Sequence, residues 1–429
     1  NLAHLLAISG LHMGLLAGFV FTALRLGLIL IPSIAAGGLA KKLAAFGGLI
    51  AAAGYLGLSG GSIATERAFV MAAVTVGAVI LERRAISLRA VALAALIILV
   101  RRPEAITGPG FQMSFAATTA LVVVFTIMNR RNAGKAPRNP IVSISVGTLI
   151  SSAVAGFATL PIAAAHFNMI SHYGLLANLI SVPLMGVLVI PMAVVAVCLL
   201  PLHLEWIPLM LMGYGLDWIL GVADAVSHWP DAVSKVPAPP DWAFFSLCLG
   251  LLWMALMMSK VRLVGLLPVC IALLVWAQVQ RPDVLISDTG SLVGVLRDGG
   301  RALSKEKGSG FVASVWLEND GDAIFQKRAA GRWEGGRTIN AGGHSVHAAS
   351  GKRGLAGFKG CNRKDIVVFS EAYKGDATCE IFDRNRLRET GSISITFDEN
   401  GIADITTARA MAGRQYWDTK ALRKARFGH

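Results

Sequence analysis

Four small groups of polar side chains interrupt the apolar segments of this chain, and their types suit hydrogen bonding to water and to a polar substrate. The groups are His4, Ser9 and His12; Thr65, Glu66 and Arg67; Gln112 and Ser114; and His166, Asn168 and His172 followed by Asn178. Polar side chains at membrane depth are costly unless they face protein or water. Each group therefore needs a structural or a functional explanation.

The sequence leaves both explanations open for each group taken alone. The serine and the glycines of the first group can cap or closely pack a helix, and Glu66 with Arg67 can form an interfacial ion pair. Gln112 can follow a helix start after the turn Gly108-Pro109-Gly110. All four groups, however, lie at span ends that we predict to share one side of the membrane, which favours a common water-filled vestibule.

The composition is that of a membrane protein with a soluble part. Hydrophobic residues make up 54% of the 429 residues and charged residues only 15%. Residues 1–282 carry 17 Lys and Arg and 8 Asp and Glu, whereas residues 283–429 carry 23 and 18. We predict a polytopic membrane domain over 1–282, a small soluble domain over 283–419 and a basic, disordered tail over 420–429. The net charge of +14 fits a positive-inside bias of the loops.

Apolar stretches of spanning length recur through the membrane domain, so we expect a mainly α fold class with about 8–10 spans. The predicted spans are Met13–Ile31, Leu43–Leu58, Ile63–Leu81, Leu88–Val100, Phe111–Met128, Ile141–Ala165, Gly174–Leu200, Trp242–Ser259 and Val261–Val279. The stretch Trp206–Trp229 carries Asp217 and Asp224 and is either a weak span or an interfacial helix.

Basic residues after the first, third and fifth spans set the orientation. These loops hold Lys41 and Lys42, then Arg83, Arg84 and Arg89, then Arg130, Arg131, Lys135 and Arg138. The alternate loops are close to neutral, so the positive-inside rule places the basic loops in the cytoplasm. The soluble domain is then extracytoplasmic if Trp206–Trp229 crosses the membrane, and cytoplasmic if it does not.

The segment Gly174–Leu200 contains Asn178 together with Pro183 and Pro191. Proline removes a hydrogen bond from the helical ladder, and irregular backbone inside a membrane is tolerated where it lines a cavity. Pro183 is therefore a candidate helix break of the kind found at transport sites. A kinked structural helix is the alternative.

The soluble domain is predicted to be β-rich. We expect strands at Leu292–Leu296, Gly310–Leu317, Ile366–Phe369 and Ile393–Phe397, separated by Gly, Asn and Asp turns. His344 and His347 would need further zinc ligands that no spacing selects, so we predict no metal site. Cys361 and Cys379 are expected to form a disulfide if the domain is extracytoplasmic, and two free thiols are the alternative.

Motifs that would assign other functions are absent from the sequence. It contains no Gly-x4-Gly-Lys-Ser/Thr phosphate loop, so any transport would need an outside motor or a gradient. It contains no His-Glu-x-x-His zinc-protease motif, and we expect no cofactor. The first residue is Asn1, and no signal peptide precedes the first span. We expect a fragment whose upstream part is absent.

Four ordered motifs resemble those of the ComEC-type competence protein family, the inner-membrane channel proteins of bacterial DNA uptake. The motif His4–His12 is similar to the family's opening signature, and Gly110–Ala116 is similar to its Gly-Phe-Gln-Leu-Ser-Phe-Ala element. Ala64–Met71 is similar to its Arg-Ala-x-x-Met segment, although Thr65-Glu66 stands where a Ser or Thr and a variable residue are usual. The family's order and spacing are also followed by Pro161, Phe167-Asn168, Ser171, Asn178 and Pro183.

This resemblance, which covers about residues 1–280, implies a multi-pass bacterial inner-membrane channel that passes single-stranded DNA into the cytoplasm during natural transformation. Because every nucleotide carries a negative charge, the path must be wet and lined by donors rather than carboxylates. The channel candidates are His4, Ser9, His12, Arg67, Gln112, Ser114, Asn168 and Asn178. The implied partners are single-stranded DNA, membrane lipids, a DNA receptor and a cytoplasmic helicase or motor.

Residues 283–419 resemble a decayed metallo-β-lactamase-like domain, which other family members carry at the C-terminus. Ile286–Gly300 is similar to its opening strands, and Gly391–Ile395 through Tyr416-Trp417 is similar to its closing ones. The His-x-His-x-Asp-His metal motif is absent, and without it a two-metal hydrolase cannot generate hydroxide. We therefore predict that the chain is not an enzyme. The alternatives are a transporter of another substrate on the same fold, or a membrane-anchored hydrolase acting through the soluble domain.

Overall fold

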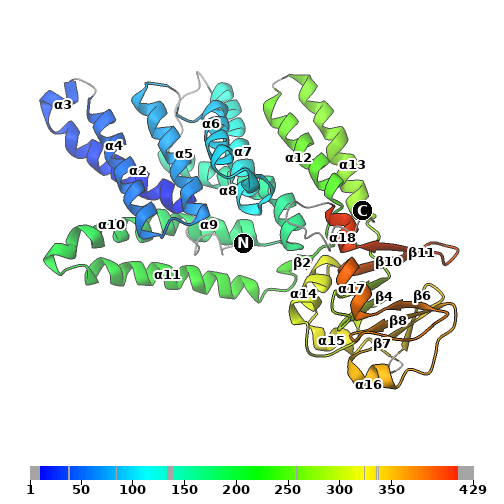
Figure 1. Ribbon diagram of the computed structural model, residues 1–429. Helices are drawn as coiled ribbons and strands as arrows, with labels where there is room; N and C mark the ends of the chain where they lie inside the picture. The colour runs from blue at the N-terminus through cyan, green and yellow to red at the C-terminus, as the bar shows by residue number, and fades with distance from the viewer. Residues whose placement is uncertain are drawn as a thin grey trace. The chain divides into compact units, whose positions relative to one another are not determined.

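The computed structural model describes residues 10–36, 39–83, 85–132, 139–257, 259–322, 324–334, 336 and 338–413. The chain divides into two compact units, Asn1–Ser234 with Leu249–Leu266, and Lys235–Cys248 with Leu267–His429. Helices dominate the first unit, and the two larger β-sheets belong to the second (Figure 1). The predicted fold class, a mainly helical membrane protein followed by a β-containing region, is confirmed. The division of the sequence at residue 282 stays a prediction.

The first unit is a series of apolar helices that run back and forth. Its first helices are α2 (Gly10–Ile29), α3 (Pro32–Ala36), α4 (Leu39–Leu58), α5 (Ile63–Ile80), α6 (Leu88–Arg101), the 3-10 turn η1 (Pro103–Thr107), α7 (Pro109–Asn132) and α8 (Pro140–Phe167). The strand β1 (Met169–Ser171) follows and pairs with β2 (Val233–Lys235). Between them lie α9 (Gly174–Leu184), the π-helical turn η2 (Met185–Val189), α10 (Ile190–Leu199), η3 (Leu200–Leu202) and α11 (Trp206–Ser227).

Eight helices of the described part are long and apolar enough to cross a membrane. They are Gly10–Ile29, Leu39–Leu58, Ile63–Ile80, Pro109–Asn132, Ser145–Phe167, Gly174–Leu202, Trp206–Ser227 and Lys260–Ala277. Two shorter apolar helices, α6 and α12 (Asp241–Leu256), match the remaining predicted spans. The stretch from Trp206 onward is one continuous helix of spanning length.

The start of α5 is fixed by a serine cap. The Oγ atom of Ser62 accepts the backbone N–H of Thr65 at 3.3 Å, and the two hydroxyl oxygens are 2.5 Å apart. Such a cap satisfies an N–H group that the helix itself leaves free. Glu66 and Arg67 therefore lie in the first turn of α5, at the end of a span.

Small residues bring α2 and α4 into close contact. A Cβ atom at Gly48 would lie 2.9 Å from the backbone oxygen of Ala17, and Ala44 and Ala52 on α4 are fully buried. Close backbone approach through small residues is a common way to pack helices in a membrane, where apolar burial gives no advantage over lipid. The glycine- and alanine-rich sequence of α4 thus explains its position beside α2.

The π-helical turn η2 separates α9 from α10, and a proline lies on either side of it. Pro183 is inside α9, and Pro191 is at the start of α10. Because each proline removes a backbone donor, the helix widens here to re-pair its carbonyl groups. A Cβ atom at Gly215 of α11 would lie 2.8 Å from Val189, so α11 packs tightly against this turn. In Figure 1 the α10–α11 pair runs across the direction of α4 and α5.

The second unit contains two β-sheets. The strands are β3 (Val284–Ile286), β4 (Val293–Arg297), β5 (Gly300–Leu303), β6 (Thr338–Ala341), β7 (His344–Ala349), β8 (Asp365–Phe369), β9 (Glu380–Phe382), β10 (Ile393–Phe397) and β11 (Ala403–Thr407). One sheet has the order β11-β10-β3-β4-β5 and is antiparallel throughout. The other has the order β6-β7-β8-β9 and pairs β7, β8 and β9 in parallel.

A single apolar core lies between these two sheets. It contains Val284, Ile286 and Ile395 from the first sheet and Val346 and Val368 from the second, all with at most traces of exposure. Side chains of a strand alternate between faces, which is why valines and isoleucines at every second position of β3 and β10 meet in this core. Three of the four predicted strands are found, within a residue or so, as β4, β8 and β10.

The fourth predicted strand, Gly310–Leu317, is wrong. These residues form the helix α14 (Gly310–Asn319), which is followed by α15 (Gln326–Ala330). Ala313 and Leu317 are the buried residues of α14, and they pack against Leu292 and Leu303. A spacing of four residues lies on one helical face, so a short apolar run that looked like a strand contributes a helical stripe instead.

Six further helical segments complete the described part of the chain. They are α12 (Asp241–Leu256), η4 (Lys260–Gly265), α13 (Leu266–Ala277), α16 (Gly351–Ala356), α17 (Arg384–Thr390) and α18 (Ala408–Ala412). Ala243 and Leu247 of α12 pack against Ala272 of α13. Asp383 caps α17 by accepting the backbone N–H of Arg386 at 2.9 Å.

A buried ion pair joins the first sheet to α14. The guanidinium of Arg301, on β5, is fully buried and donates two hydrogen bonds to the carboxylate of Asp320, which follows α14. It also donates to the backbone oxygen of Pro282 at 3.0 Å. A Cβ atom at Gly294 would lie 2.8 Å from Arg301 Cδ, so the glycine leaves the room that this side chain fills.

Candidate functional site

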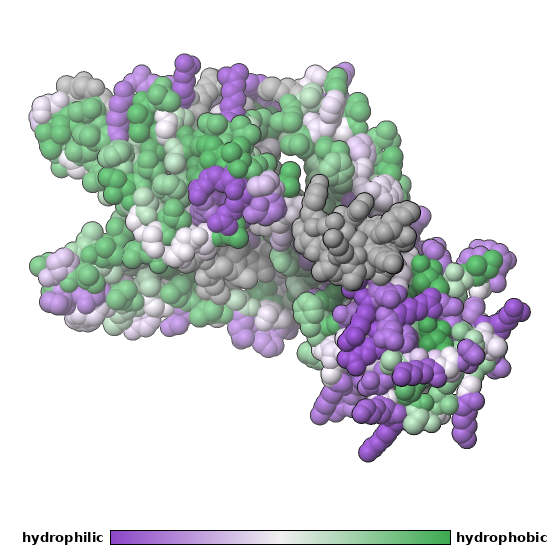
Figure 2. Space-filling view, viewed as in Figure 1, coloured by the Kyte–Doolittle hydropathy of each residue, from purple (hydrophilic) through white to green (hydrophobic). Residues whose placement is uncertain are grey.

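Charged residues from α5 and α6 meet at one end of the first unit. The carboxylate of Glu66 pairs with Arg101 at 2.7 Å and with Arg102 at 3.3 Å. Glu66 is mostly buried, whereas both arginine side chains are substantially exposed. Exposed ion pairs add little stability. The main effect of this contact is therefore to neutralise Glu66, which is the only acidic residue in the four polar groups of the sequence analysis. Figure 2 shows a hydrophilic patch within the hydrophobic surface of the first unit.

Arg67 follows directly and lies against Gly110 at the start of α7. A Cβ atom at Gly110 would be 2.8 Å from Nη2 and 3.0 Å from Nη1 of Arg67. The absence of a side chain at Gly110 therefore makes room for the guanidinium. The Nε atom of Arg67 is buried and has no hydrogen-bond partner among the described residues. A buried donor of this kind is costly when it is unpaired, and it can serve water or an anion.

Gln112 links the same start of α7 to the end of α8. Its Nε2 atom donates to the backbone oxygen of Ile106 at 2.9 Å, and its Oε1 atom lies 2.8 Å from Nε2 of His166. An amide oxygen only accepts, so His166 carries its proton on Nε2 in this pair. One side chain thus connects η1, α7 and α8.

Ser114 and His12 lie close to these residues on neighbouring helices. The hydroxyl of Ser114 contacts the sulfur of Met71 on α5 at 3.9 Å. His12 is half-buried in the first turn of α2, and a Cβ atom at Gly10 would lie 3.9 Å from Ala68. The start of α2 therefore meets the start of α5. The sequence candidates His4 and Ser9 lie outside the described residues.

The turn after α8 is built on Asn168, which is buried and has a left-handed backbone with φ +52°. Asparagine tolerates this conformation better than most residues. The chain then reaches His172, whose Nε2 atom lies 2.7 Å from the hydroxyl of Ser234. Asn168 and His172 thus shape the exit from α8.

Asn178 and Ser181 place two unpaired polar atoms on α9. The Oδ1 atom of Asn178 and the Oγ atom of Ser181 are buried and have no hydrogen-bond partner within the described ranges. Residues three apart share a helix face, and this face neighbours Ala177, which packs in a cluster with Leu11 and Leu15 of α2. These atoms are places where water or a polar substrate gains hydrogen bonds.

The structure brings Arg67, Gln112 and Ser114 together and puts His12 on an adjoining helix, while Asn178 lies on α9. Contact between any of these residues and a substrate stays a prediction. Sequence reasoning missed Arg101, Arg102 and Ser181. The pair Arg101-Arg102 at the end of an apolar span, facing a loop with Glu66, was the available signal. Ser181 was detectable as the residue one turn after Asn178.

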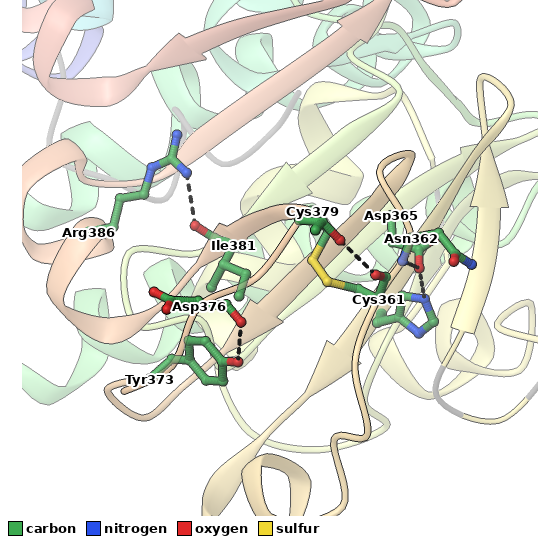
Figure 3. Close-up of a disulfide and its surroundings, with 10 residues drawn as sticks. Cys361, Asn362, Asp365, Tyr373, Asp376, Cys379, Ile381 and Arg386 are labelled. Atoms are coloured by element: carbon green, nitrogen blue, oxygen red, sulfur yellow. Dashed lines mark hydrogen bonds and ion pairs between the residues drawn. A yellow bond between two sulfur atoms is a disulfide. The ribbon is translucent and has the colours of Figure 1, made fainter.

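The histidines considered as zinc ligands and the two cysteines of the second unit make other contacts. Cys361 and Cys379 are bonded to each other (Figure 3). His347 hydrogen-bonds Thr338 at 2.8 Å, and His344 stacks on Phe397. Among the residues that the structure describes, no three His, Cys, Asp or Glu side chains gather closely enough to hold a metal ion. Tyr416-Trp417 and residues 420–429 fall outside the described part.

Comparisons with known proteins identify relatives of this chain. A family model described as Competence protein matches residues 1–261. ComE operon protein 3 of Bacillus subtilis (strain 168) is 29% identical over 264 residues, which are 60% of this chain and 31% of that protein. The match therefore spans less than a third of that relative's length. No solved structure matches the chain.

The contact between Gln112 and His166 is testable by a double-mutant cycle. We expect Gln112→Ala and His166→Ala to show a coupling energy of about 1 kcal/mol, because each variant alone removes the same hydrogen bond. The measurement is SDS-induced unfolding of the purified chain in a mild detergent. Thr126→Ala, more than three turns along α7, is the control and should combine additively with Gln112→Ala. Additive effects of Gln112→Ala and His166→Ala would contradict the contact.

Proposed function

This chain belongs to the competence protein family, and we propose that it acts in DNA uptake, with its first unit passing single-stranded DNA across the bacterial inner membrane. The observation that carries the proposal is the meeting of polar side chains from α5, α6, α7 and α8 at one end of apolar helices. ComE operon protein 3 of Bacillus subtilis is similar to this chain over 264 residues.

The charge of this end suits a polyanion. A strand carries one negative charge per nucleotide, and its path must replace some of the water around those charges. Arg67 offers an unpaired buried donor, while Arg101 and Arg102 outnumber the carboxylate of Glu66 that they hold. The residual charge is positive, so phosphates are attracted rather than repelled.

The neutral groups suit passage rather than tight binding. Conduction requires that each contact be weak enough for the substrate to leave. Gln112, Ser114, Asn178 and Ser181 offer single hydrogen bonds without charge. We assign them, with His12, to the wall of a hydrated path, and we assign no energy source to the chain itself. The proposed partners are therefore a DNA receptor, membrane lipids and a cytoplasmic helicase or motor.

We also place the soluble domain outside the cytoplasm. Disulfides persist in oxidising compartments and are rare in the cytosol, and Cys361 is bonded to Cys379. If the two shorter apolar helices cross with the eight longer ones, the number of crossings is even. The end with Glu66 and Arg67, which faces away from the basic loops, then lies on the same side as the soluble domain.

Arg67 is the first residue to test. We expect Arg67→Ala to lower the frequency of transformation by added DNA about tenfold or more, because a hydrogen bond to a charged group contributes about 1.5–3 kcal/mol. Arg67→Lys keeps the charge but loses the planar fork, so an intermediate loss is expected. The measurement is transformation frequency in a competent strain that carries each variant in place of its own copy.

The control for Arg67 is Arg25→Ala, which removes an exposed arginine from the far half of α2. It should leave the frequency unchanged. Membrane levels of each variant are compared by immunoblot, so that misfolding is separated from loss of uptake. Normal transformation by well-expressed Arg67→Ala would contradict the proposed path.

The side of the soluble domain is testable through its disulfide. In a variant whose other three cysteines are serine, Cys361 and Cys379 should react with maleimide-polyethylene glycol in intact spheroplasts only after treatment with a membrane-impermeant phosphine. The reason is that an extracytoplasmic disulfide is oxidised yet accessible. Labelling without reduction would contradict the disulfide, and labelling that needs lysis would place the domain in the cytoplasm.

We propose that the soluble domain does not cleave DNA, because the sequence lacks the His-x-His-x-Asp-His motif that would assemble two metal ions. The purified chain should leave end-labelled single-stranded DNA intact in the presence of zinc, manganese or magnesium. Cleavage that follows the protein through gel filtration would instead support a membrane-anchored hydrolase.

A further inference from the structure

A cavity of about 540 Å³ opens on the second unit beside the disulfide. Two short segments line it, one immediately before Cys361 and one shortly before Cys379. The first contributes Phe358 and Lys359, and the second contributes Tyr373 and Lys374. The sulfur–sulfur bond therefore ties the two walls of the cavity to each other. A cavity of this volume is in the usual range for small-ligand sites.

The walls of this cavity include a cluster of three aromatic rings. Tyr373 stacks on the buried Phe369 with centroids 5.3 Å apart and planes within 5°. Phe358 stands edge-on to both rings, at 5.2 Å from Phe369 and 5.9 Å from Tyr373. Phe358 and Tyr373 are half-buried and line the cavity, whereas Phe369 is fully buried behind them. The cavity thus has a rigid aromatic wall.

Exposed cations line this cavity or lie close to its lining residues in the sequence. They are Lys352, Arg353, Lys359, Arg363, Lys364 and Lys374, and in the described part of the chain none of them pairs with a carboxylate. The neighbouring acid Glu371 is held by Arg384 at 3.7 Å, and Asp365 lies 3.7 Å from His347. Asp376 is the one carboxylate on the cavity lining. The region therefore carries an excess of positive charge.

We propose that this cavity binds single-stranded nucleic acid, with one base against Phe358 and Tyr373 and the adjoining phosphates at Lys359 and Lys374. Aromatic platforms flanked by cations are the usual means by which proteins bind single strands without reading their sequence. A concave aromatic wall fits a base. An anionic membrane would instead be met by protruding aromatic side chains. The site would hold a strand near the membrane without cleaving it.

This site is separate from the path proposed for the first unit and involves none of its residues. Its binding can therefore be measured when transport fails, and its loss is distinguishable from a loss at Arg67. The disulfide provides a further expectation for binding at this site. If Cys361 and Cys379 hold the two walls in place, reduction should weaken binding although neither sulfur contacts the strand.

The experiment uses the full chain in phosphatidylcholine nanodiscs with a fluorescein-labelled oligothymidylate. We expect Tyr373→Ala to weaken binding about tenfold, whereas Tyr373→Phe, which keeps the ring, should bind as the unmodified chain does. The double variant Lys359→Ala/Lys374→Ala should also reduce the slope of log Kd against log salt by about 1.4, because each lost phosphate contact removes about 0.7. Asp376→Asn should tighten binding.

Matched controls separate this site from general charge effects and from misfolding. The pair Lys327→Ala/Arg328→Ala removes the same charge from the exposed side of α15 and should leave Kd unchanged. Ultraviolet crosslinking of an oligonucleotide that contains 5-iodouracil should attach to the peptide holding Phe358 or Tyr373, as mass spectrometry would show. Thermal melting of each variant checks folding.

Three results would overturn the proposal. One is crosslinking confined to the first unit, and another is equal binding by Tyr373→Ala and Tyr373→Phe when both are folded. The third concerns the variant Lys359→Ala/Lys374→Ala. It would overturn the proposal if this variant no longer bound phosphatidylglycerol vesicles but still bound the oligonucleotide as the unmodified chain does. That result would assign the cavity to a lipid surface.

Discussion

The contact between Arg67 and Gly110 is the constraint on which the first unit depends. A guanidinium at the end of a span must be held by protein or by water, since lipid offers it nothing. It reaches its place because Ser62 fixes the start of α5 and because Gly110 has no side chain in the way. The same pairing sets α5 against α7. Glu66 then meets α6 and Gln112 meets α8 at the same end.

This arrangement leaves several buried polar atoms without a hydrogen-bond partner in the described structure. The helices could have ended on apolar residues, yet they leave buried polar atoms of Arg67, Asn178 and Ser181 without partners in the described structure. Groups of this kind lower the stability of the fold unless something else satisfies them. Water and a passing polyanion both can, and neither needs a permanent site. Incomplete pairing is what a path requires and a structural core avoids.

Sequence reasoning predicted the elements that a local pattern specifies, and it failed for the elements whose structure depends on tertiary packing. Apolar length predicted the spans, and short runs between turn residues predicted β8 and β10, because both signals depend on neighbouring residues. Gly310–Leu317 is ambiguous at eight residues, and its helical form follows from contacts with Leu292 and Leu303 that no local pattern encodes. The roles of Arg101 and Arg102 likewise follow from a partner far away in sequence, Glu66.

The core between the two sheets of the second unit is distinct from the aromatic cluster beside the disulfide. This core is apolar, and the buried pair of Arg301 and Asp320 joins the first sheet to α14. Removing one partner of a buried pair is strongly destabilising, so both residues are needed for the stability of this unit. The strand binding that we propose uses the surface of this unit and leaves this core untouched. The wall of Phe358 and Tyr373, which is tied by a disulfide and has exposed cations close to it in the sequence, is the surface best suited to that use.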